Sequence, residues 1–255
     1  MQPLKRRGWA AMPPTRASTL LMLAGTLAAL VAGTVGPATA TAAGGSTVVQ
    51  PTQALAILRD SHTTMSAPNA HSAEVQQVSA RRPITGERTV LPVVGQRTGA
   101  DGVDWLHVLL PGRPNGHTGW IRQRATVAWT TSWHIVIHTA TRRVTVYRDG
   151  RSLRTFRAVV GKASTPTPHG QFFVEEDVQL RPGDAGAPFA LALSARSDVL
   201  QEFDGGPGQI ALHGLANIGG VLGSAVSHGC VRLANDAMRW LVVRIGPGVP
   251  VTISS

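Results

Sequence analysis

The sequence predicts a mainly β protein, and its composition, its turn residues and its short strand-like stretches each support that class. Of the 255 residues, 43% are apolar and 15% are charged, which excludes intrinsic disorder because disorder requires low hydrophobicity and dense charge. The 28 glycines and 17 prolines provide many turns without making a low-complexity chain. Strand-like stretches recur between these turns, as in a small sandwich or barrel. We therefore expect strands nearly throughout, with one helix near the C-terminal end.

The first 43 residues have the pattern of an export signal peptide. Lys5, Arg6 and Arg7 precede the apolar stretch Leu20–Val35, and a tract of small residues follows up to Ala43. A basic start, an apolar centre and small-residue cleavage sites define such a signal. We expect cleavage and an exported, secreted protein of the cell envelope. An uncleaved anchor is the alternative, and only in that case do we expect contact with a membrane.

The formal charge of +10 comes partly from this leader, and the remaining positive charge is interpreted as spread along the chain rather than clustered. Proteins that bind nucleic acids combine a basic stripe with stacking aromatic side chains. We identify neither in the sequence and expect no nucleic-acid partner. Mild attraction to an anionic cell envelope is the interpretation that remains.

The exported part divides into three segments. Residues 44–83 are polar and irregular in pattern, so we expect a linker or extension there. Residues 84–130 follow with short strand patterns separated by turn clusters. Within them, Trp105-Leu106-His107-Val108 followed by Gly119-Trp120-Ile121 resembles a bacterial Src-homology-type small β-barrel. That resemblance implies a module that binds peptides or wall polymers, or one that packs against a catalytic partner.

Residues 131–255 continue the β pattern, and we expect them to form a catalytic domain. A hairpin pattern surrounds the turn Asp149-Gly150, a dipeptide that favours tight hairpin turns. Only Asn235–Ile245 has the pattern of a helix, with Asn235 as its cap. The stretch Val249–Ile253 predicts a closing strand.

The neighbours of Cys230 predict a nucleophile. It is the only cysteine, which excludes an intramolecular disulfide, and it lies in the run Ser227-His228-Gly229-Cys230-Val231-Arg232. A second histidine, His213, ends an apolar strand before Gly214. A thiol has an ordinary pKa of about 8.5, so it needs a base or a cation to react at neutral pH, and histidine suits that task. Gly229 allows close approach of the backbone to a substrate.

Two other interpretations of the same residues remain open. In the first interpretation, Cys230 is an inert buried cysteine beside a loop histidine, since free cysteine is among the most buried residue types. In the second, His213, His228 and Cys230 hold a zinc ion with one open position.

The segments Ile210-Ala211-Leu212-His213-Gly214 and Ser227-His228-Gly229-Cys230-Val231-Arg232-Leu233 resemble the signature of the YkuD-type L,D-transpeptidase family. The resemblance covers roughly Trp133–Ile253. It implies a closed or sandwich-like, mainly β catalytic domain that cross-links peptidoglycan stem peptides outside the membrane. The Cys230 thiol then attacks a donor tetrapeptide, and an amine acceptor on a neighbouring stem resolves the thioester. The resemblance also implies acylation by carbapenem-type inhibitors, with no cofactor and no metal.

Roles for single residues follow from the same resemblance. His213 is the expected base, oriented by the Gly214 backbone, and it is expected to keep the Cys230 sulfur anionic. The amides of His228, Gly229 and Cys230 are expected to form an oxyanion hole, with loop-holding by the His228 ring as an alternative.

Substrate binding is expected of Arg232, Ser227 and His169. A guanidinium binds carboxylate in two-point fashion, so Arg232 is a candidate clamp for the donor stem. Many members of the family carry Asn at this position, and Arg232 is therefore a departure from the pattern.

Two alternative functions use the same residues. The first is an L,D-carboxypeptidase or cross-link hydrolase, in which water rather than an amine resolves the thioester. The second is a non-catalytic wall-binding protein in which the small barrel does the binding and the thiol is idle.

Overall fold

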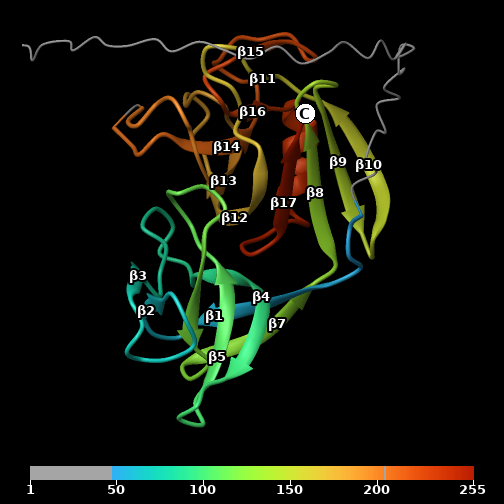
Figure 1. Ribbon diagram of the computed structural model, residues 1–255. Helices are drawn as coiled ribbons and strands as arrows, with labels where there is room; N and C mark the ends of the chain where they lie inside the picture. The colour runs from blue at the N-terminus through green and yellow to red at the C-terminus, as the bar shows by residue number, and fades with distance from the viewer. Residues whose placement is uncertain (1–47, 204) are drawn as a thin grey trace, which may run out of the picture. The chain divides into compact units, whose positions relative to one another are not determined.

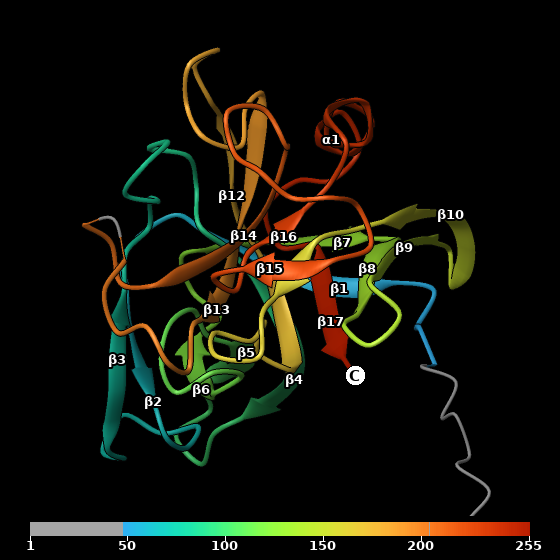
Figure 2. The same ribbon diagram turned by 90° about the horizontal axis from the view of Figure 1, so that it is seen from above.

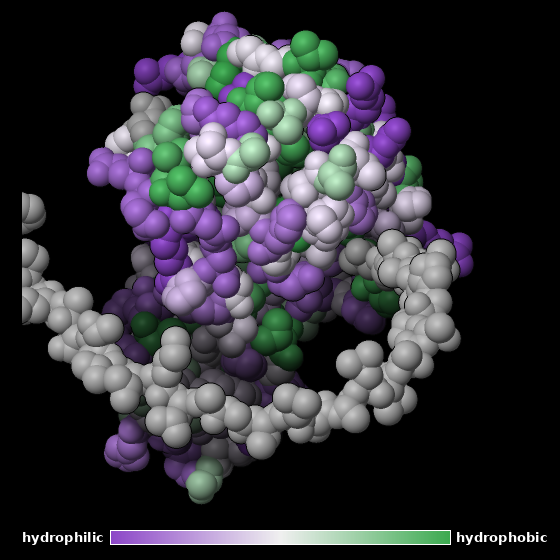
Figure 3. Space-filling view, turned by 45° about the horizontal axis from the view of Figure 1, so that its top comes forward, coloured by the Kyte–Doolittle hydropathy of each residue, from purple (hydrophilic) through white to green (hydrophobic). Residues whose placement is uncertain are grey.

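The computed structural model describes residues 48–203 and 205–255, and its secondary structure confirms the mainly β class (Figure 1). The signal peptide expected at residues 1–43 lies outside these residues. Within the described part of the chain, no helix is long and apolar enough to cross a membrane. Figure 3 shows the face around β11 (Val160–Gly161), β15 (Ala225–Ser227) and β16 (Val231–Arg232), where hydrophilic residues dominate and hydrophobic ones form small separate groups.

The first sheet has seven antiparallel strands in the order β3-β2-β6-β5-β4-β1-β7. In chain order they are β1 (Gln53–Leu58), β2 (His62–Met65), β3 (Glu74–Val78), β4 (Val90–Thr98), β5 (Asp104–Leu109), β6 (Thr118–Arg122) and β7 (Thr126–Thr131). No pairing between β3 and β7 closes this sheet within the described residues. The likeness to a Src-homology-type barrel stays a prediction.

The structure corrects the expectation that residues 44–83 are irregular, because β1, β2 and β3 lie within that segment. The small sheet domain therefore begins at Gln53. The strands β2 and β3 have the sequences HTTM and EVQQV, and β3 is a largely exposed edge strand. Such a strand lacks the apolar alternation on which sequence analysis depends.

The second sheet has eight strands in the order β10-β9-β8-β17-β12-β13-β14-β16, and β11 pairs separately with β15. The strands not yet bounded are β8 (Trp133–His138), β9 (Arg143–Arg148), β10 (Arg151–Arg157), β12 (Gly170–Gln179), β13 (Phe189–Arg196), β14 (Gln209–His213) and β17 (Pro250–Ser254). A single bridge joins Val159, just after β10, to Arg232 in β16. The two ends of the sheet therefore come together near Arg232.

Two local predictions for this half can be compared with the structure. The hairpin β9–β10 turns at Asp149 and Gly150, both with positive φ (+52° and +75°), as expected for a two-residue turn. The helix α1 (Asn235–Val242) is shorter than expected and contacts β13 and β14 (Figure 2). The prediction that Asn235 caps this helix is wrong. Its Oδ1 instead accepts the Leu215 amide at 2.8 Å, and no side chain caps the helix.

The strand β12 contributes to both hydrophobic cores. Phe172 is buried in the core of the second sheet, whereas its neighbour Phe173 is buried in the core of the first. Successive strand residues point to opposite faces, so β12 is a wall shared by the two sheets. The next outward position is the fully buried Glu175.

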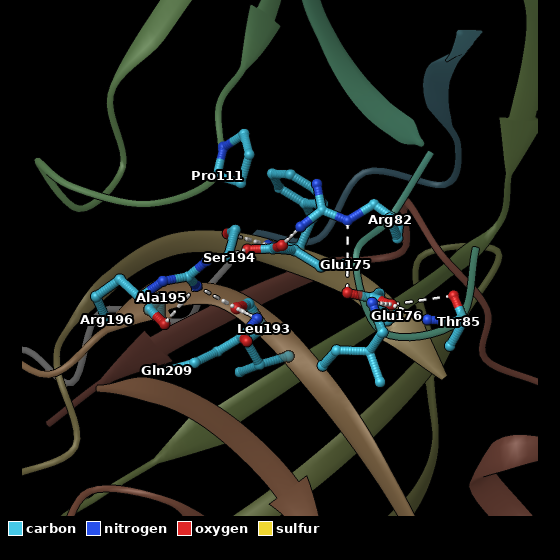
Figure 4. Close-up of polar contacts among 12 residues, drawn as sticks. Arg82, Thr85, Pro111, Glu175, Glu176, Leu193, Ser194, Ala195, Arg196 and Gln209 are labelled. Carbon is cyan, nitrogen blue, oxygen red and sulfur yellow. Dashed lines mark hydrogen bonds and ion pairs between the residues drawn. The ribbon is translucent and has the colours of Figure 1, made fainter. Parts of the chain in front are cut away.

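Glu175 and Glu176 of β12 belong to a cluster of ion pairs and hydrogen bonds with Arg82, Thr85 and Arg196 (Figure 4). Glu175 lies between two arginines, pairing with Arg196 at 3.0 Å and with Arg82 from the loop between β3 and β4. Glu176 Oε2 accepts the Thr85 amide at 2.8 Å and the Thr85 hydroxyl at 3.0 Å. These contacts fix the loop of the small sheet domain to β12 and β13.

The structure corrects the interpretation that positive charge is spread evenly. The segment 142–157 carries six arginines and a single acidic residue, Asp149. Sheet pairing places Arg148 opposite Arg151 and Arg143 opposite Arg157. The concentration of arginines is visible in the sequence of this segment, and the hairpin then places arginines of its two strands opposite each other.

Candidate active site

The strands β14 and β16 place His213 and Cys230 on one face of the sheet. They pair in parallel, with Leu212 opposite Val231 and His213 opposite Arg232. Leu212 and Val231 are fully buried in the core. Because side chains alternate along a strand, His213, Cys230 and Arg232 lie on the other face. The predicted base and the predicted nucleophile therefore face the same side of two neighbouring strands, and their catalytic roles stay predictions.

The orientation of His213 agrees with the role expected of Gly214. The ring Nδ1 lies 2.8 Å from the Gly214 carbonyl oxygen, which only accepts hydrogen bonds, so Nδ1 carries the proton and donates it. The other nitrogen, Nε2, is then left with a lone pair. Burial lowers the pKa of His213, and the charge of Arg232 lowers it further. The buried ring is therefore neutral at pH 7 and able to accept a proton.

Gly186, in the loop between β12 and β13, packs directly on the His213 ring. A Cβ at this position would lie 2.8 Å from the ring Cγ, and the backbone has φ +87°. The Gly186 carbonyl also accepts the Gly214 amide at 2.7 Å. Glycine is required here by both the conformation and the close approach.

Cys230 is half-buried, and its thiol lies 3.9 Å from the Gln209 carbonyl. Burial raises the pKa of Cys230, and this effect outweighs the Ala211 amide and the Arg232 charge, which both lower it. The resting thiol is thus protonated, which corrects the expectation of a resting thiolate. Within the described residues no hydrogen bond joins the His213 ring to Cys230, and catalytic hydrogen bonds are often long until substrate binds.

The turn from Ser227 to Cys230 corrects two expectations. Ser227 is fully buried, and its Oγ donates to the Cys230 carbonyl at 2.6 Å and accepts the Gly229 amide at 3.1 Å. Its expected role in substrate binding is therefore wrong, because the hydroxyl is occupied in holding the turn. The Gly229 amide is likewise engaged, which leaves the His228 and Cys230 amides as candidate oxyanion donors.

Gly229 contributes through its backbone conformation. Its φ is +121°, and a Cβ there would lie 2.9 Å from Ile210 Cδ1. Left-handed conformations of this kind favour glycine. Gly229 therefore shapes the turn that presents Cys230.

Two buried threonines that sequence analysis did not identify brace this turn. Thr165 Oγ1 donates to the Ser227 carbonyl at 3.2 Å, and Thr167 Oγ1 donates to the Gly229 carbonyl at 2.8 Å. Thr167 Oγ1 also accepts the Gly161 amide at 2.9 Å. The signal was present in the sequence, since Pro166 and Pro168 stiffen the loop on both sides of Thr167.

Arg232 is buried beneath the loop that follows β14. One nitrogen, Nη1, donates to the Gly219 carbonyl, and Nε is buried without a hydrogen-bond partner. Its charge lowers the pKa of both His213 and Cys230. The role of carboxylate clamp stays a prediction, whereas its electrostatic effect on the site follows from the geometry.

The two other histidines predicted for the site, His228 and His169, each contact one nearby side chain. The exposed His228 ring stacks on Phe203, with ring centroids 5.4 Å apart and planes inclined by 30°. His169 is exposed, and its Nε2 shares a hydrogen bond with Thr139 Oγ1 at 2.9 Å. Substrate binding by His169 stays a prediction.

The small sheet domain reaches this site through Arg113, which sequence analysis did not identify. Its guanidinium donates to the carbonyls of Ser197 at 2.8 Å, Leu200 at 3.0 Å and Pro207 at 2.9 Å. These carbonyls flank Phe203, which stacks on His228. No local sequence signal indicates this role, because it depends on contacts between distant loops.

No group of three His, Cys, Asp or Glu side chains in the described part of the chain is arranged to hold a metal ion. The arrangement instead offers a thiol, a neutral imidazole with one free lone pair and two unpaired amides on a tight turn. Together these groups suit acyl transfer through a thioester.

Comparisons with known proteins point to the same half of the chain. The family model of the L,D-transpeptidase catalytic domain (YkuD) matches residues 132–253. The YkuD protein of Bacillus subtilis (strain 168) is 29% identical over 126 residues, which cover 49% of this chain and 68% of that protein. L,D-transpeptidase 1 of Mycobacterium tuberculosis is 31% identical over 121 residues, which cover 43% of this chain and 45% of that protein.

A solved structure of L,D-transpeptidase 3 from Mycobacterium tuberculosis, in complex with a faropenem-derived adduct, is also similar. It is 15% identical with a TM-score of 0.42, covering 66% of this chain and 91% of that chain.

Proposed function

Residues 132–253 form a YkuD-type L,D-transpeptidase catalytic domain, and from this premise we propose that the chain cross-links peptidoglycan stem peptides through a thioester on Cys230. The observation that supports the proposal is the pairing of β14 with β16, since His213 ends β14 opposite Arg232 and Cys230 directly precedes β16. Both of these relatives are named L,D-transpeptidases, which supports the reaction class.

The first half-reaction moves the acyl group to sulfur. His213 Nε2 accepts the thiol proton while the sulfur attacks the carbonyl of the third residue of the donor tetrapeptide. A general base is required here because burial keeps the resting thiol protonated. The amides of His228 and Cys230 stabilise the oxyanion, and one such donor contributes roughly 10²–10³ in rate. The terminal D-residue leaves as an amine that takes the proton from His213.

The second half-reaction returns the acyl group to nitrogen. An amine of a neighbouring stem attacks the thioester, His213 accepts the proton of that amine, and the C–S bond breaks. The released Cys230 sulfur then takes the proton back from His213. The new amide thus conserves the acyl activation of the bond that was broken, so no nucleotide is consumed. This economy suits a reaction outside the cytoplasm, and the leader pattern at residues 1–43 supports export to the cell envelope.

Incubation of the purified protein with a tetrapeptide stem, with and without an amine acceptor, tests the reaction. We expect cross-linked dimer from the wild-type protein and none from Cys230→Ala. Release of tripeptide without any dimer would instead identify an L,D-carboxypeptidase.

A β-lactam of the carbapenem class tests the thiol separately. We expect an intact-mass adduct on the wild-type protein and none on Cys230→Ala. A protein that forms neither adduct nor product, while binding isolated cell wall equally with and without Cys230, would contradict catalysis and favour wall binding alone.

A further inference from the structure

The hairpin β9–β10 carries a concentration of exposed positive charge. All six arginines between 142 and 157 are exposed, and their only acidic neighbour in that segment is Asp149. The register places Arg148 directly opposite Arg151 and Arg143 directly opposite Arg157. Like charges directly opposite each other destabilise a sheet. A negatively charged partner on this surface would remove that cost.

Four arginines on one side of the hairpin form a surface that we call the arginine shelf, defined as Arg148, Arg151, Arg154 and Arg244. Arg148 and Arg151 are opposite each other, and Arg154 pairs with Val146, two residues before Arg148, so all three share a face. Arg244 follows α1 and lies over the ring of Trp240 at 4.5 Å.

The shelf is supported from below by aromatic rings. Arg148 lies 5.2 Å from the centre of the Trp133 ring, and Arg154 lies 5.2 Å from that of Trp240. The two tryptophans meet edge to face with centroids 6.4 Å apart. A guanidinium stacked on a ring keeps its in-plane N–H donors for other partners. The stacking therefore orients the donors before any partner binds.

Protein acids do little to neutralise the shelf. The one ion pair is that of Arg148 with Asp149 at 3.7 Å, in which both side chains are more than half exposed (58% and 68%). Arg151, Arg154 and Arg244 have no ion pair within the described residues.

Two exposed apolar side chains lie next to the shelf arginines in the sequence. Leu153 is 54% exposed at the irregular position of β10, and Val243 is 74% exposed beside Arg244. Cationic side chains mixed with exposed apolar ones are typical of surfaces that meet a lipid interface.

The start of the described chain lies at the same hairpin. A Cβ on Gly150, at the hairpin tip, would meet the Val49 carbonyl at 3.2 Å and the Pro51 ring at 3.4 Å. The sequence that leads back to the apolar stretch Leu20–Val35 therefore joins the fold beside this hairpin.

We propose that the arginine shelf docks this protein on the surface of an anionic lipid bilayer. The guanidinium groups bind lipid phosphates through paired N–H donors, while Leu153 and Val243 contact the boundary of the acyl chains. This surface is separate from the thiol site, and the proposal extends the function inferred above by fixing where the enzyme works.

Vesicle binding tests the proposal with the protein lacking residues 1–43, so that the leader cannot insert. Residues 46–255 form one compact unit, and thermal unfolding of each variant checks that the fold is kept. The probes are vesicles of phosphatidylglycerol mixed with phosphatidylcholine and vesicles of phosphatidylcholine alone. The shelf variant is Arg151→Gln with Arg154→Gln. The control, Arg97→Gln with Arg124→Gln, removes the same amount of charge from exposed positions on the small sheet domain.

We expect salt-sensitive binding to the anionic vesicles only. The shelf variant should bind roughly 10- to 30-fold more weakly, because each basic residue near an anionic surface adds about 1 kcal/mol of binding free energy. The control should bind less than about threefold more weakly, because its arginines lie away from the shelf. Equal losses in the two variants, or no binding to either vesicle, would overturn the proposal. Tighter binding to soluble polyphosphate or duplex DNA than to the vesicles would overturn it as well. Carbapenem acylation of Cys230 should be unchanged in the shelf variant, so this test is independent of the proposed reaction.

Discussion

Replacing Gly186 by Ala tests whether the His213 ring is positioned by its contact with this glycine. The added Cβ would lie 2.8 Å from the ring Cγ and closer still to Nδ1, whereas ordinary contact begins at 3.4 Å, so the ring must move by more than about 0.6 Å. This movement works against the hydrogen bond from Nδ1 to the Gly214 carbonyl. A displacement of about 1 Å at a catalytic group can cost roughly 10²-fold in rate. We therefore expect Gly186→Ala to slow acylation of Cys230 by about tenfold or more.

The matched control is Gly102→Ala. Gly102 has a similar left-handed conformation (φ +75° against +87°), but a Cβ there meets nothing within 4 Å. In both variants the alanine in a left-handed conformation should lower the free energy of unfolding by about 1–2 kcal/mol. Only Gly186→Ala should lose activity.

The assay is the rate of carbapenem acylation followed by intact-protein mass, together with denaturant unfolding of each variant. If Gly186→Ala acylates within about threefold of Gly102→Ala, the ring is not held by this contact and the reasoning fails.

Three further predictions follow from other parts of the structure. Arg232→Gln removes a charge that lowers the pKa of His213, so the pKa of His213 should rise in this variant. Because the base must be neutral, activity is lost as pH falls through that pKa, and the acid limb of the kcat/KM profile should move to higher pH. An acid limb that does not move would exclude this coupling. Arg113→Ala should slow Cys230 acylation about tenfold with little change in unfolding, with partial recovery in Arg113→Lys, because the carbonyls that it holds flank the ring stacked on His228. Glu175→Gln should cost about 3–5 kcal/mol in denaturant unfolding because it leaves two buried arginines without their shared carboxylate, and a loss under about 1 kcal/mol would show that the cluster is not an ion-pair core.

The features that sequence analysis predicted are those carried by adjacent residues. The turn at Asp149-Gly150 is predictable because two neighbouring residues provide the positive φ values that a tight hairpin needs. The support of His213 by Gly214 is similar, since the acceptor is the next residue in the chain. The pairing of His213 with Cys230 stays a prediction, and it rests on two short, specific motifs.

Features that depend on contacts between distant segments were missed or misjudged. Gly186 approaches His213 from a different loop, and nothing in its own neighbourhood indicates that contact. Ser227 is among the expected substrate-binding residues, yet its hydroxyl donates to the Cys230 carbonyl and accepts the Gly229 amide within the turn. The protonation state of Cys230 follows from burial, which a single sequence does not specify.

The division of β12 between two cores limits how this protein can be taken apart. Cutting the chain before Ser132, to isolate the segment that matches the family model, would leave Phe173 in water and strip Glu175 and Glu176 of Arg82 and Thr85. The amino-terminal strands therefore also cover the outward face of β12, in addition to any binding module that they form. Exchanging these strands for another module would therefore also require substitutions on the outward face of β12.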